Sequence, residues 1–283
     1  MSDGASPKRS DLPIAVFDSG VGGLTVLHEL LVSLPEEDYL YLGDSANFPY
    51  GDRRREDLGE CVARNTALLL ERGAKLIVIA CNSAAAAGLD RARQVADRHR
   101  VPVIAVIEPE ALIAASITAS GRVGVLATAA TVESGAYLVA LRRQRPDLEI
   151  TEVAAHDLAP IIQRGFPFDQ EVVDTVRAYC EPLREADVDT VILGCTHFPL
   201  VRPMLQRILG RDVRLVTAGH AVAATAQRVL ESRQISAEPR GEGSYRFLCT
   251  GDAESFRALG TRFLQMPLGD VEPVDPTAAT LGT

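Results

Sequence analysis

Short runs of apolar residues alternate along this chain with longer stretches of helical pattern. The runs PIAVFD, KLIVIA and DTVILG are almost entirely apolar, as expected for strands covered by helices on both faces. The predicted strands are residues 13–18, 38–43, 75–80, 101–106, 122–127, 149–154, 189–194, 213–217 and 245–250. Strands that alternate with helices in this way predict an α/β fold with parallel sheets.

Two of the intervening segments have a clear helical period. Residues 24–34 place leucines at spacings of three and four, and residues 171–183 repeat apolar residues at the same spacing. Both segments are predicted to be helices. Residues 236–244 are rich in Pro, Gly and Glu and predict a surface loop, and residues 271–283 predict a loose tail.

The chain contains a weak internal sequence repeat, which we call the internal echo. IAVFDSG followed by KLIVIACNS in the first part resembles VGVLATA followed by DTVILGCTH in the second part, at a similar spacing. The echo predicts two similar α/β halves, and a chain of 283 residues is at the size where two domains are expected. The alternative is that any two βα units look alike over so few residues.

Composition narrows the function classes. The chain is 47% apolar and has 29 Lys and Arg against 38 Asp and Glu, a net charge of −9, so no nucleic-acid partner is expected. The polar N-terminus has no signal-peptide pattern, and no run approaches the ~18 apolar residues of a membrane span. We therefore expect a cytoplasmic protein with no membrane partner.

The cysteines are the first candidates for catalytic residues. Five of them, an odd number, are scattered at positions 61, 81, 180, 195 and 249, which indicates neither a disulfide framework nor metal-ligand spacing. Cys81 and Cys195 each stand where a predicted strand passes into a helix. A helix N-terminus lowers the pKa of a thiol, so we expect either thiol to act as a base or nucleophile.

An alternative interpretation of these two positions is structural. Cysteine is a small hydrophobic residue that is favoured inside proteins, and Asn82, Ser83 or Thr196 would then cap the following helix. His197 would be a buried structural histidine rather than a proton carrier. If the two halves face each other, however, both thiols lie at the carboxyl edges of their sheets and flank one cleft.

The turn FDSGVGGLTVL, residues 17–27, resembles a dinucleotide-binding turn. Thr25 stands where the Rossmann fingerprint requires a third Gly or Ala, and no Gly-Lys-Ser/Thr makes it a phosphate loop, which weakens that reading. Asp44 keeps it open, because it follows the next strand where a ribose-binding acid would lie. The loop LGDSANFPYGDR, residues 42–53, is at the same sheet edge and is a candidate substrate loop.

Six motifs in order resemble those of the glutamate racemases, in the cofactor-independent Asp/Glu racemase superfamily: AVFDSGVGGLTVL, YLGDSANFPYG, VIACNSAAA, VIEP, GVLATAATVESGAY and LGCTHFPL. The resemblance covers roughly residues 13 to 274. It implies two flavodoxin-like parallel-sheet domains related by a pseudo-twofold axis, formed by residues 1–105 plus 217–283 and by residues 106–216, with the active site in the cleft between them. It also implies a homodimer that racemises glutamate without a cofactor or metal and supplies D-glutamate for peptidoglycan.

The resemblance also implies the site residues. Cys81 and Cys195 would be opposed acid and base, and Asp18 and His197 would tune them as further catalytic residues. One thiolate would abstract the α-proton and the other thiol would return a proton on the opposite face. The substrate-binding residues would be Asp18, Ser19, Tyr50, Gly51, Asn82, Ser83, Thr128, Thr131, Thr196 and His197.

The chain departs from the family pattern in several places. His156 replaces a Cys, Gln163 replaces a Glu that often supports the side of the second cysteine, and Ser83 stands where Thr is commoner. Residues 215–220 read LVTAGH where many members have Asp-Ser after LV. These changes leave the thiol pair intact, and they bear on rate or on substrate preference.

Other functions remain open from the sequence. A racemase for aspartate or for several amino acids would share the cysteine pair, although THFPL after the second cysteine favours glutamate by resemblance. A two-lobed amino-acid-binding protein would have no use for two thiols. A thiol redox enzyme would need the two cysteines within ~7 Å of each other.

Overall fold

Two parallel sheets make up the framework of the molecule. The structure, a computed structural model, describes residues 8–165, 170–239 and 241–279. The first sheet has six strands in the order β10-β9-β2-β1-β3-β4, and the second has four in the order β6-β5-β7-β8. Every strand pair is parallel, so the predicted α/β class is confirmed. The strands of the first sheet are β1 (Ile14–Asp18), β2 (Tyr39–Gly43), β3 (Leu76–Ile79), β4 (Val103–Ala105), β9 (Tyr245–Cys249) and β10 (Val271–Pro273), and those of the second are β5 (Arg122–Ala127), β6 (Glu149–Ala154), β7 (Thr190–Gly194) and β8 (Arg214–Val216).

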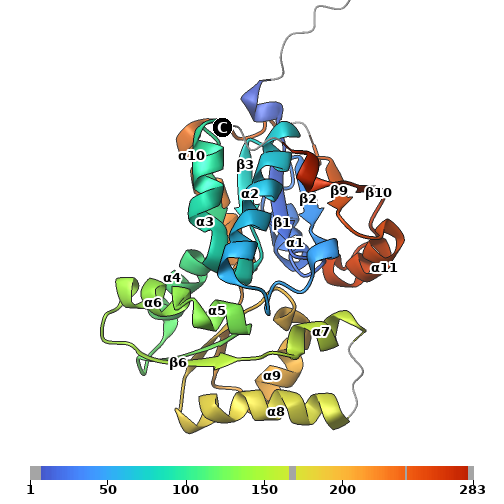
Figure 1. Cartoon of the computed structure of the whole chain (residues 1–283). Helices are drawn as coiled ribbons and strands as arrows, with labels where there is room; N and C mark the ends of the chain where they lie inside the picture. The colour runs from blue at the N-terminus through green and yellow to red at the C-terminus, as the bar shows by residue number, and fades with distance from the viewer. Residues whose placement is uncertain (1–7, 166–169, 240, 280–283) are drawn as a thin grey trace, which may run out of the picture.

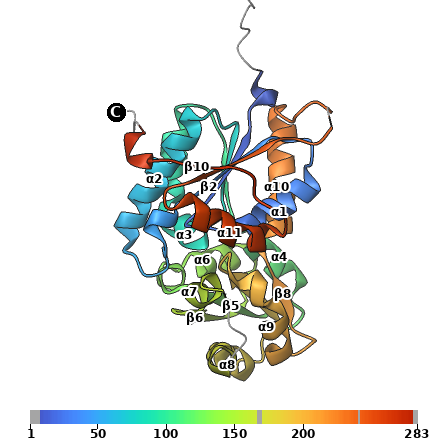
Figure 2. The ribbon, with the colours of Figure 1, turned by 90° about the vertical axis from the view of Figure 1, so that its right-hand side faces the viewer.

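Helices cover both faces of the first sheet. Figure 2 shows α2 and α3 on one side of its strands and α1 and α10 on the other. All residues of β1 are buried, which explains why its sequence is a continuous apolar run rather than an alternating one. The helices are α1 (Leu24–Ser33), α2 (Arg55–Glu71), α3 (Asn82–Asp97), α4 (Ile107–Ile117), α5 (Ala129–Glu133), α6 (Ala136–Gln144), α7 (Leu158–Gln163), α8 (Gln170–Glu185), α9 (Arg202–Leu209), α10 (Ala218–Arg233) and α11 (Ala253–Leu264), with short 3₁₀ turns at Arg9–Asp11, Ser45–Asn47, Phe198–Val201 and Pro276–Ala278.

The molecule has two lobes, one above the other in Figure 1. We call the first sheet with α1, α2, α3, α10 and α11 the first lobe, and the second sheet with α4 to α9 the second lobe. The order β2-β1-β3-β4 in the first sheet is repeated as β6-β5-β7-β8 in the second. The internal echo of the sequence therefore reflects two units of the same topology.

Sequence predictions of the elements hold with one correction. All the predicted strands are present, and the predicted helices are α1 and α8. The predicted loop at 236–244 contains no helix or strand in its described residues. The prediction of a loose tail from residue 271 is wrong, because Val271–Pro273 pairs with β9 as the edge strand β10.

The chain crosses between the lobes twice. It leaves the first sheet after β4 and enters α4 through Val106, and it returns from β8 to α10 through Thr217. The predicted domain division at residues 105 and 217 stays a prediction. Among the described residues, no helix has the length and apolar content needed to cross a membrane.

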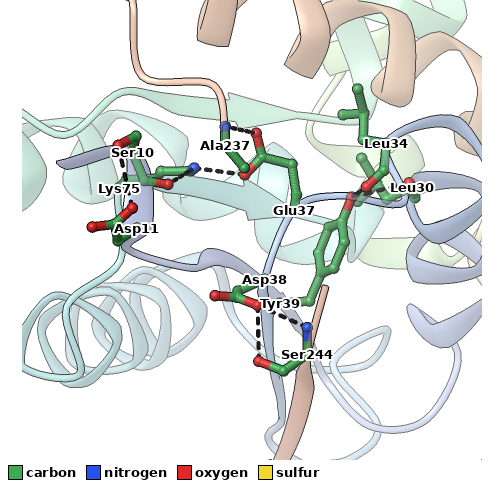
Figure 3. A network of polar contacts seen from close by, with 10 residues as sticks. All are labelled: Ser10, Asp11, Leu30, Leu34, Glu37, Asp38, Tyr39, Lys75, Ala237 and Ser244. Atoms are coloured by element: carbon green, nitrogen blue, oxygen red, sulfur yellow. Dashed lines mark hydrogen bonds and ion pairs between the residues drawn. The ribbon is translucent and has the colours of Figure 1, made fainter. Parts of the chain in front are cut away.

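A buried ion pair lies near the amino ends of the strands in the first sheet. Lys75 Nζ is 2.5 Å from Glu37 Oε2 and donates to the carbonyl oxygen of Ser10 at 2.6 Å. Glu37 Oε1 accepts from the backbone N–H of Ala237 at 2.8 Å. Figure 3 shows these four residues converging from separate segments of the chain. The carboxyl ends of the same strands are left free to build the site.

Candidate active site

Four strands end at the same place in the molecule. In the first lobe β1 ends at Asp18, and β3 is followed by Cys81, which is the N-cap of α3. In the second lobe β5 is followed by Thr128, the N-cap of α5, and β7 by Cys195. Because β1 and β3 are neighbours, as are β5 and β7, each lobe presents its pair of residues at a carboxyl edge.

Both cysteines line one cavity between the lobes. Its wall is formed by Ser19, Phe48, Pro49, Tyr50, Gly51, Asp52, Cys81, Asn82, Ser83, Thr128, His156, Ala159, Pro160, Cys195, Thr196 and His197. Its volume is about 20 Å³, which holds roughly one water molecule. This cavity is nearly closed, and a second pocket of about 200 Å³ adjoins it, since Asn82, Cys195 and Thr196 also line that pocket.

The second thiol is next to an imidazole. Cys195 Sγ lies 3.9 Å from His197 Nδ1, and His197 Nε2 lies 2.9 Å from Gln163 Oε1. Since a carbonyl oxygen only accepts, Nε2 carries the proton and Nδ1 turns its lone pair toward the thiol. Burial lowers the pKa of His197 to about 3, so the ring is neutral. The Nδ1 lone pair of His197 therefore faces the Cys195 thiol, although the low pKa makes the ring a weak base in the closed site.

Asp18 supports the first thiol and joins the two lobes. Its carboxylate accepts from the backbone N–H of Gly20 at 3.0 Å and from the hydroxyl of Thr196 at 3.1 Å. Burial raises the pKa of Asp18, and these hydrogen bonds oppose that rise. Asp18 does not line the cavity itself and lies behind Thr196, close enough for its charge to affect Cys81.

The expectation of lowered thiol pKa values is wrong for the closed site. Burial raises the pKa of Cys81 to about 12, with the charge of Asp18 adding to the rise. Burial likewise raises the pKa of Cys195 well above its ordinary value. The side chains are only 5% and 7% exposed, so the loss of hydration outweighs the helix N-terminus at Cys81. Both thiols are neutral in this state.

Three hydroxyl groups meet across the lobe boundary. Ser83 Oγ lies 2.9 Å from Thr128 Oγ1 and 3.3 Å from Thr131 Oγ1, and the two threonine oxygens are 3.0 Å apart. Hydroxyls can donate or accept, so this cluster can turn all three donors toward an anionic ligand. The sequence predicted all three residues, although Thr131 lies behind the cavity wall.

In the candidate substrate loop, residues 42–53, the hydroxyl of Tyr50 is already used in a hydrogen bond, so the loop offers backbone groups to the cavity. The hydroxyl of Tyr50 donates to Asp44 Oδ2, and Asn65 Nδ2 contacts both of these groups at 3.3 Å. The carbonyl oxygen of Gly51 accepts from the N–H of Ala130 in the second lobe at 3.0 Å. Asp44 therefore fixes the loop and is not available to bind a ribose.

The Gly-rich turn has a packing explanation. A Cβ atom on Gly22 would lie 2.3 Å from Thr196 Oγ1 and 2.6 Å from His197 Nδ1. Glycine at this position lets the first lobe approach the Thr196-His197 segment closely. The turn faces the second lobe, and it leaves no space there for the phosphates of a dinucleotide.

Sequence reasoning missed some residues of the cavity. Phe48 packs against the ring of His197, and Asp52 lines the opening. His156 lines the cavity and Gln163 holds His197, but the sequence marked them only as departures from a pattern. Phe48 and Asp52 both lie in the predicted candidate substrate loop, residues 42–53, which was the available signal for them.

Comparison with known proteins places these features in context. Residues 26–226 match the family model described as Asp/Glu/Hydantoin racemase. The glutamate racemase of Saccharopolyspora erythraea is 41% identical over 268 residues, which are 95% of this chain and 97% of that protein. A glutamate racemase isoform of Bacillus anthracis matches in structure with a TM-score of 0.88 at 34% identity, over 94% of this chain and 98% of its own. The Francisella tularensis glutamate racemase, solved with D-glutamate, matches with a TM-score of 0.88 at 31% identity and the same coverage.

Proposed function

This chain belongs to the Asp/Glu/Hydantoin racemase family, and on that premise we propose that it interconverts L-glutamate and D-glutamate through Cys81 and Cys195. The observation that carries the proposal is the placement of these two thiols. They come from equivalent positions in two lobes of equal strand order and line the same cavity. Relatives named glutamate racemase, one of them solved with D-glutamate, support the choice of substrate.

The reaction needs two proton carriers on opposite faces of one carbon. In one direction a thiolate takes the α-proton, and the electron pair stays on the α-carbon as a carbanion. The second thiol then gives its proton to the other face and becomes the thiolate, so atoms and charge balance. Donors fixed in a water-poor cavity stabilise the developing charge.

The thiolate must arise when substrate binds, because both thiols are neutral in the closed empty site. For Cys195 the proposed acceptor of the proton is Nδ1 of His197, whose pKa must rise from about 3 when the substrate binds. For Cys81 it is the carboxylate of Asp18, whose raised pKa makes it a better base than an exposed carboxylate. The ammonium group of the amino acid adds a positive charge that lowers the pKa of a nearby thiol.

The hydroxyl cluster of Ser83, Thr128 and Thr131 is the proposed site for a carboxylate of glutamate. Backbone groups of Ser19, Tyr50 and Gly51 and the side chains of Asn82 and Thr196 complete the proposed contacts. Asp18 and Cys81 then lie on the first-lobe side of the α-carbon, and Cys195 and His197 lie on the second-lobe side.

The wider role follows from the proposed reaction. We propose that the protein is a cytoplasmic homodimer that supplies D-glutamate for peptidoglycan, and that residues 1–105 plus 217–283 and residues 106–216 are its two domains. The strands of the first sheet come only from residues 14–105 and 245–273, and those of the second only from residues 122–216, which supports this division.

Chiral chromatography of purified protein incubated with L-glutamate, without any added cofactor, tests the activity. D-Glutamate should appear and approach an equal amount of the L-isomer. L-Aspartate in a parallel reaction should be converted much more slowly. No D-glutamate under these conditions would overturn the proposed function.

Heavy water tests the two-thiol mechanism separately. Starting from L-glutamate, the first D-glutamate formed should carry deuterium at the α-carbon, while the remaining L-glutamate stays largely unlabelled. The donating thiol has exchanged with solvent, whereas the abstracting thiolate faces the other side. Early product that retains the original proton would indicate a single base.

A further inference from the structure

Glu110 is an acidic residue buried in an apolar helix. It lies on α4 and is 0% exposed, as is its neighbour Ala111. A buried carboxyl group is unfavourable unless other groups hydrogen-bond to it. Its contacts therefore indicate what it does.

The carboxyl group of Glu110 closes a triangle of hydrogen bonds. Asn82 Nδ2 donates to Glu110 Oε2 at 3.1 Å and to the Tyr137 hydroxyl at 2.6 Å. The Tyr137 hydroxyl donates to the same Oε2. Asn82 belongs to the first lobe, whereas Glu110 and Tyr137 are on α4 and α6 of the second lobe. The triangle therefore spans the lobes directly behind the cavity.

These contacts use all the donors of the Asn82 amide. Its nitrogen has two hydrogens, and Glu110 and Tyr137 accept both. Asn82 also lines the cavity that holds Cys81 and Cys195. The carbonyl oxygen Oδ1 is thus the one polar atom of this side chain that remains for a ligand.

We propose that Glu110 is a positioning residue that fixes the Asn82 amide so that only its carbonyl oxygen is presented to the substrate. This inference rests on the proposed racemase function. A carbonyl oxygen accepts hydrogen bonds and cannot donate them, so it suits the ammonium group of glutamate and disfavours either carboxylate. Glu110 thereby sets which end of the amino acid lies beside Asn82, although it does not touch the substrate.

The carboxyl group of Glu110 accepts these hydrogen bonds in its neutral, protonated form. Burial raises the pKa of Glu110 to about 8, so the group is mostly a carboxylic acid at neutral pH. The second oxygen, Oε1, has no hydrogen-bond partner among the described residues. Both hydrogen bonds that Glu110 accepts are therefore made to the single oxygen Oε2. The side-chain carbonyl oxygen of a glutamine at this position can replace it.

Steady-state kinetics of Glu110→Met and Glu110→Gln tests the proposal. Methionine has a similar length but offers no oxygen, so KM for L-glutamate should rise about tenfold while kcat changes less. Glutamine keeps an acceptor and should recover most of the lost KM. Glu108→Gln is the matched control on the same helix, since Glu108 is partly exposed and pairs only with Arg143 in the described residues.

Glutarate, which lacks the amino group, tests the assignment of the ammonium. Its inhibition constant should be within about twofold of wild type in Glu110→Met, because Asn82 has no ammonium to accept from. Glutarate weakened as much as glutamate, or an unchanged KM in a methionine variant made from active wild type, would overturn the proposal. Inactive wild-type protein would instead overturn the proposed function.

A double-mutant cycle shows whether Glu110 acts through Asn82. In an Asn82→Ala background, Glu110→Met should have no further effect on KM, whereas additive effects would contradict the proposal. If the methionine variant does not fold, NMR of the wild-type protein tests whether Asn82 is held by the hydrogen-bond triangle. The Asn82 side-chain amide protons should exchange slowly with solvent, and exchange as fast as in an exposed asparagine would exclude the triangle.

Discussion

At the scale of single residues, the two thiols differ in the groups that support them. Cys81 has the carboxylate of Asp18 behind it, whereas Cys195 has the neutral ring of His197, held by Gln163. A carboxylate and an imidazole accept protons over different pH ranges. In the proposed mechanism the two halves of the reaction therefore depend on different supporting groups, although both reacting atoms are sulfur.

Gln163→Glu is expected to change the second thiol through His197. A carboxylate beside Nε2 favours the protonated ring, and a positive ring lowers the pKa of the nearby Cys195 thiol. The pH profile of kcat/KM should move to lower pH by about one unit. Gln163→Met is the control that removes the hydrogen bond without adding charge, and it should reduce activity with no such movement. An unmoved profile in Gln163→Glu would show that residue 163 does not act through the ring.

Glu110 also makes stability depend on pH. Its pKa is about 8 in the folded protein, above the ordinary value of 4.5, so the folded state binds a proton that the unfolded state releases. The resulting stabilisation is complete below about pH 4.5 and is lost as the pH rises toward 8. Urea unfolding of wild type and Glu110→Gln should therefore show the wild type losing a few kcal/mol relative to the variant between pH 5 and pH 8. A constant difference would contradict the raised pKa.

At the scale of elements, glycines set how closely the lobes approach. Gly22, in the turn before α1, has the side chains of Thr196 and His197 where a Cβ would be, at 2.3 and 2.6 Å. Gly20 in the same turn would place its Cβ at an ordinary 3.4 Å from Phe48. Alanine substitutions at Gly22 and Gly20 therefore form a matched test and control for the close approach of the lobes.

Gly22→Ala is expected to reduce kcat/KM by about 10²-fold or more, because small displacements of catalytic groups have effects of that size. The first lobe would have to move away from Thr196 and His197 to admit the methyl group. Gly20→Ala should retain activity within a few-fold. Equal activity of the two variants in the chiral assay would show that this approach is unimportant.

The elements could largely be predicted from the sequence, whereas their interactions could not. Central strands such as β1, β3 and β7 are fully buried apolar runs, and the more exposed β6 and β9 were also predicted, but β10 is a three-residue edge strand with a Pro and has no such signal. The positions of Cys81 and Cys195 follow from their strand ends. The roles of Gly22 and Glu110 depend on contacts between distant segments. The predicted direction of the thiol pKa shifts was wrong because it took account of the helix N-terminus but not of the burial of the sulfur atoms.

At the scale of the whole molecule, closure controls access to the chemistry. Hydrogen bonds across the boundary, such as that from Thr196 to Asp18, hold the lobes around a cavity of about 20 Å³. Glutamate is far larger than the single water molecule that fits. We therefore expect the lobes to separate around the two crossings at Val106 and Thr217 when glutamate binds.

Burial of Cys81 and Cys195 predicts that both thiols are unreactive when no substrate is present. With the pKa of Cys81 at about 12, alkylation by iodoacetamide at pH 8 should be at least about 10²-fold slower than for a free cysteine. Mass spectrometry of peptides containing Cys81 and Cys195 measures the rate at each site. The same protein in urea is the control and should react fully. Rapid alkylation of folded protein would mean that the lobes are mostly open.

The environment of the buried ion pair between Lys75 and Glu37 is completed only late in the synthesis of the chain. Glu37 is held by the N–H of Ala237, and β2 is covered at its edge by β9, so both wait for residues made some two hundred positions later. The four strands of the second sheet are complete once β8 has left the ribosome. Until β9 follows, β2 is an apolar strand with an unpaired edge, which is a template for association with other chains. The lobe made first is thus the last to be completed, and we expect nascent chains to associate with other chains most readily during that interval.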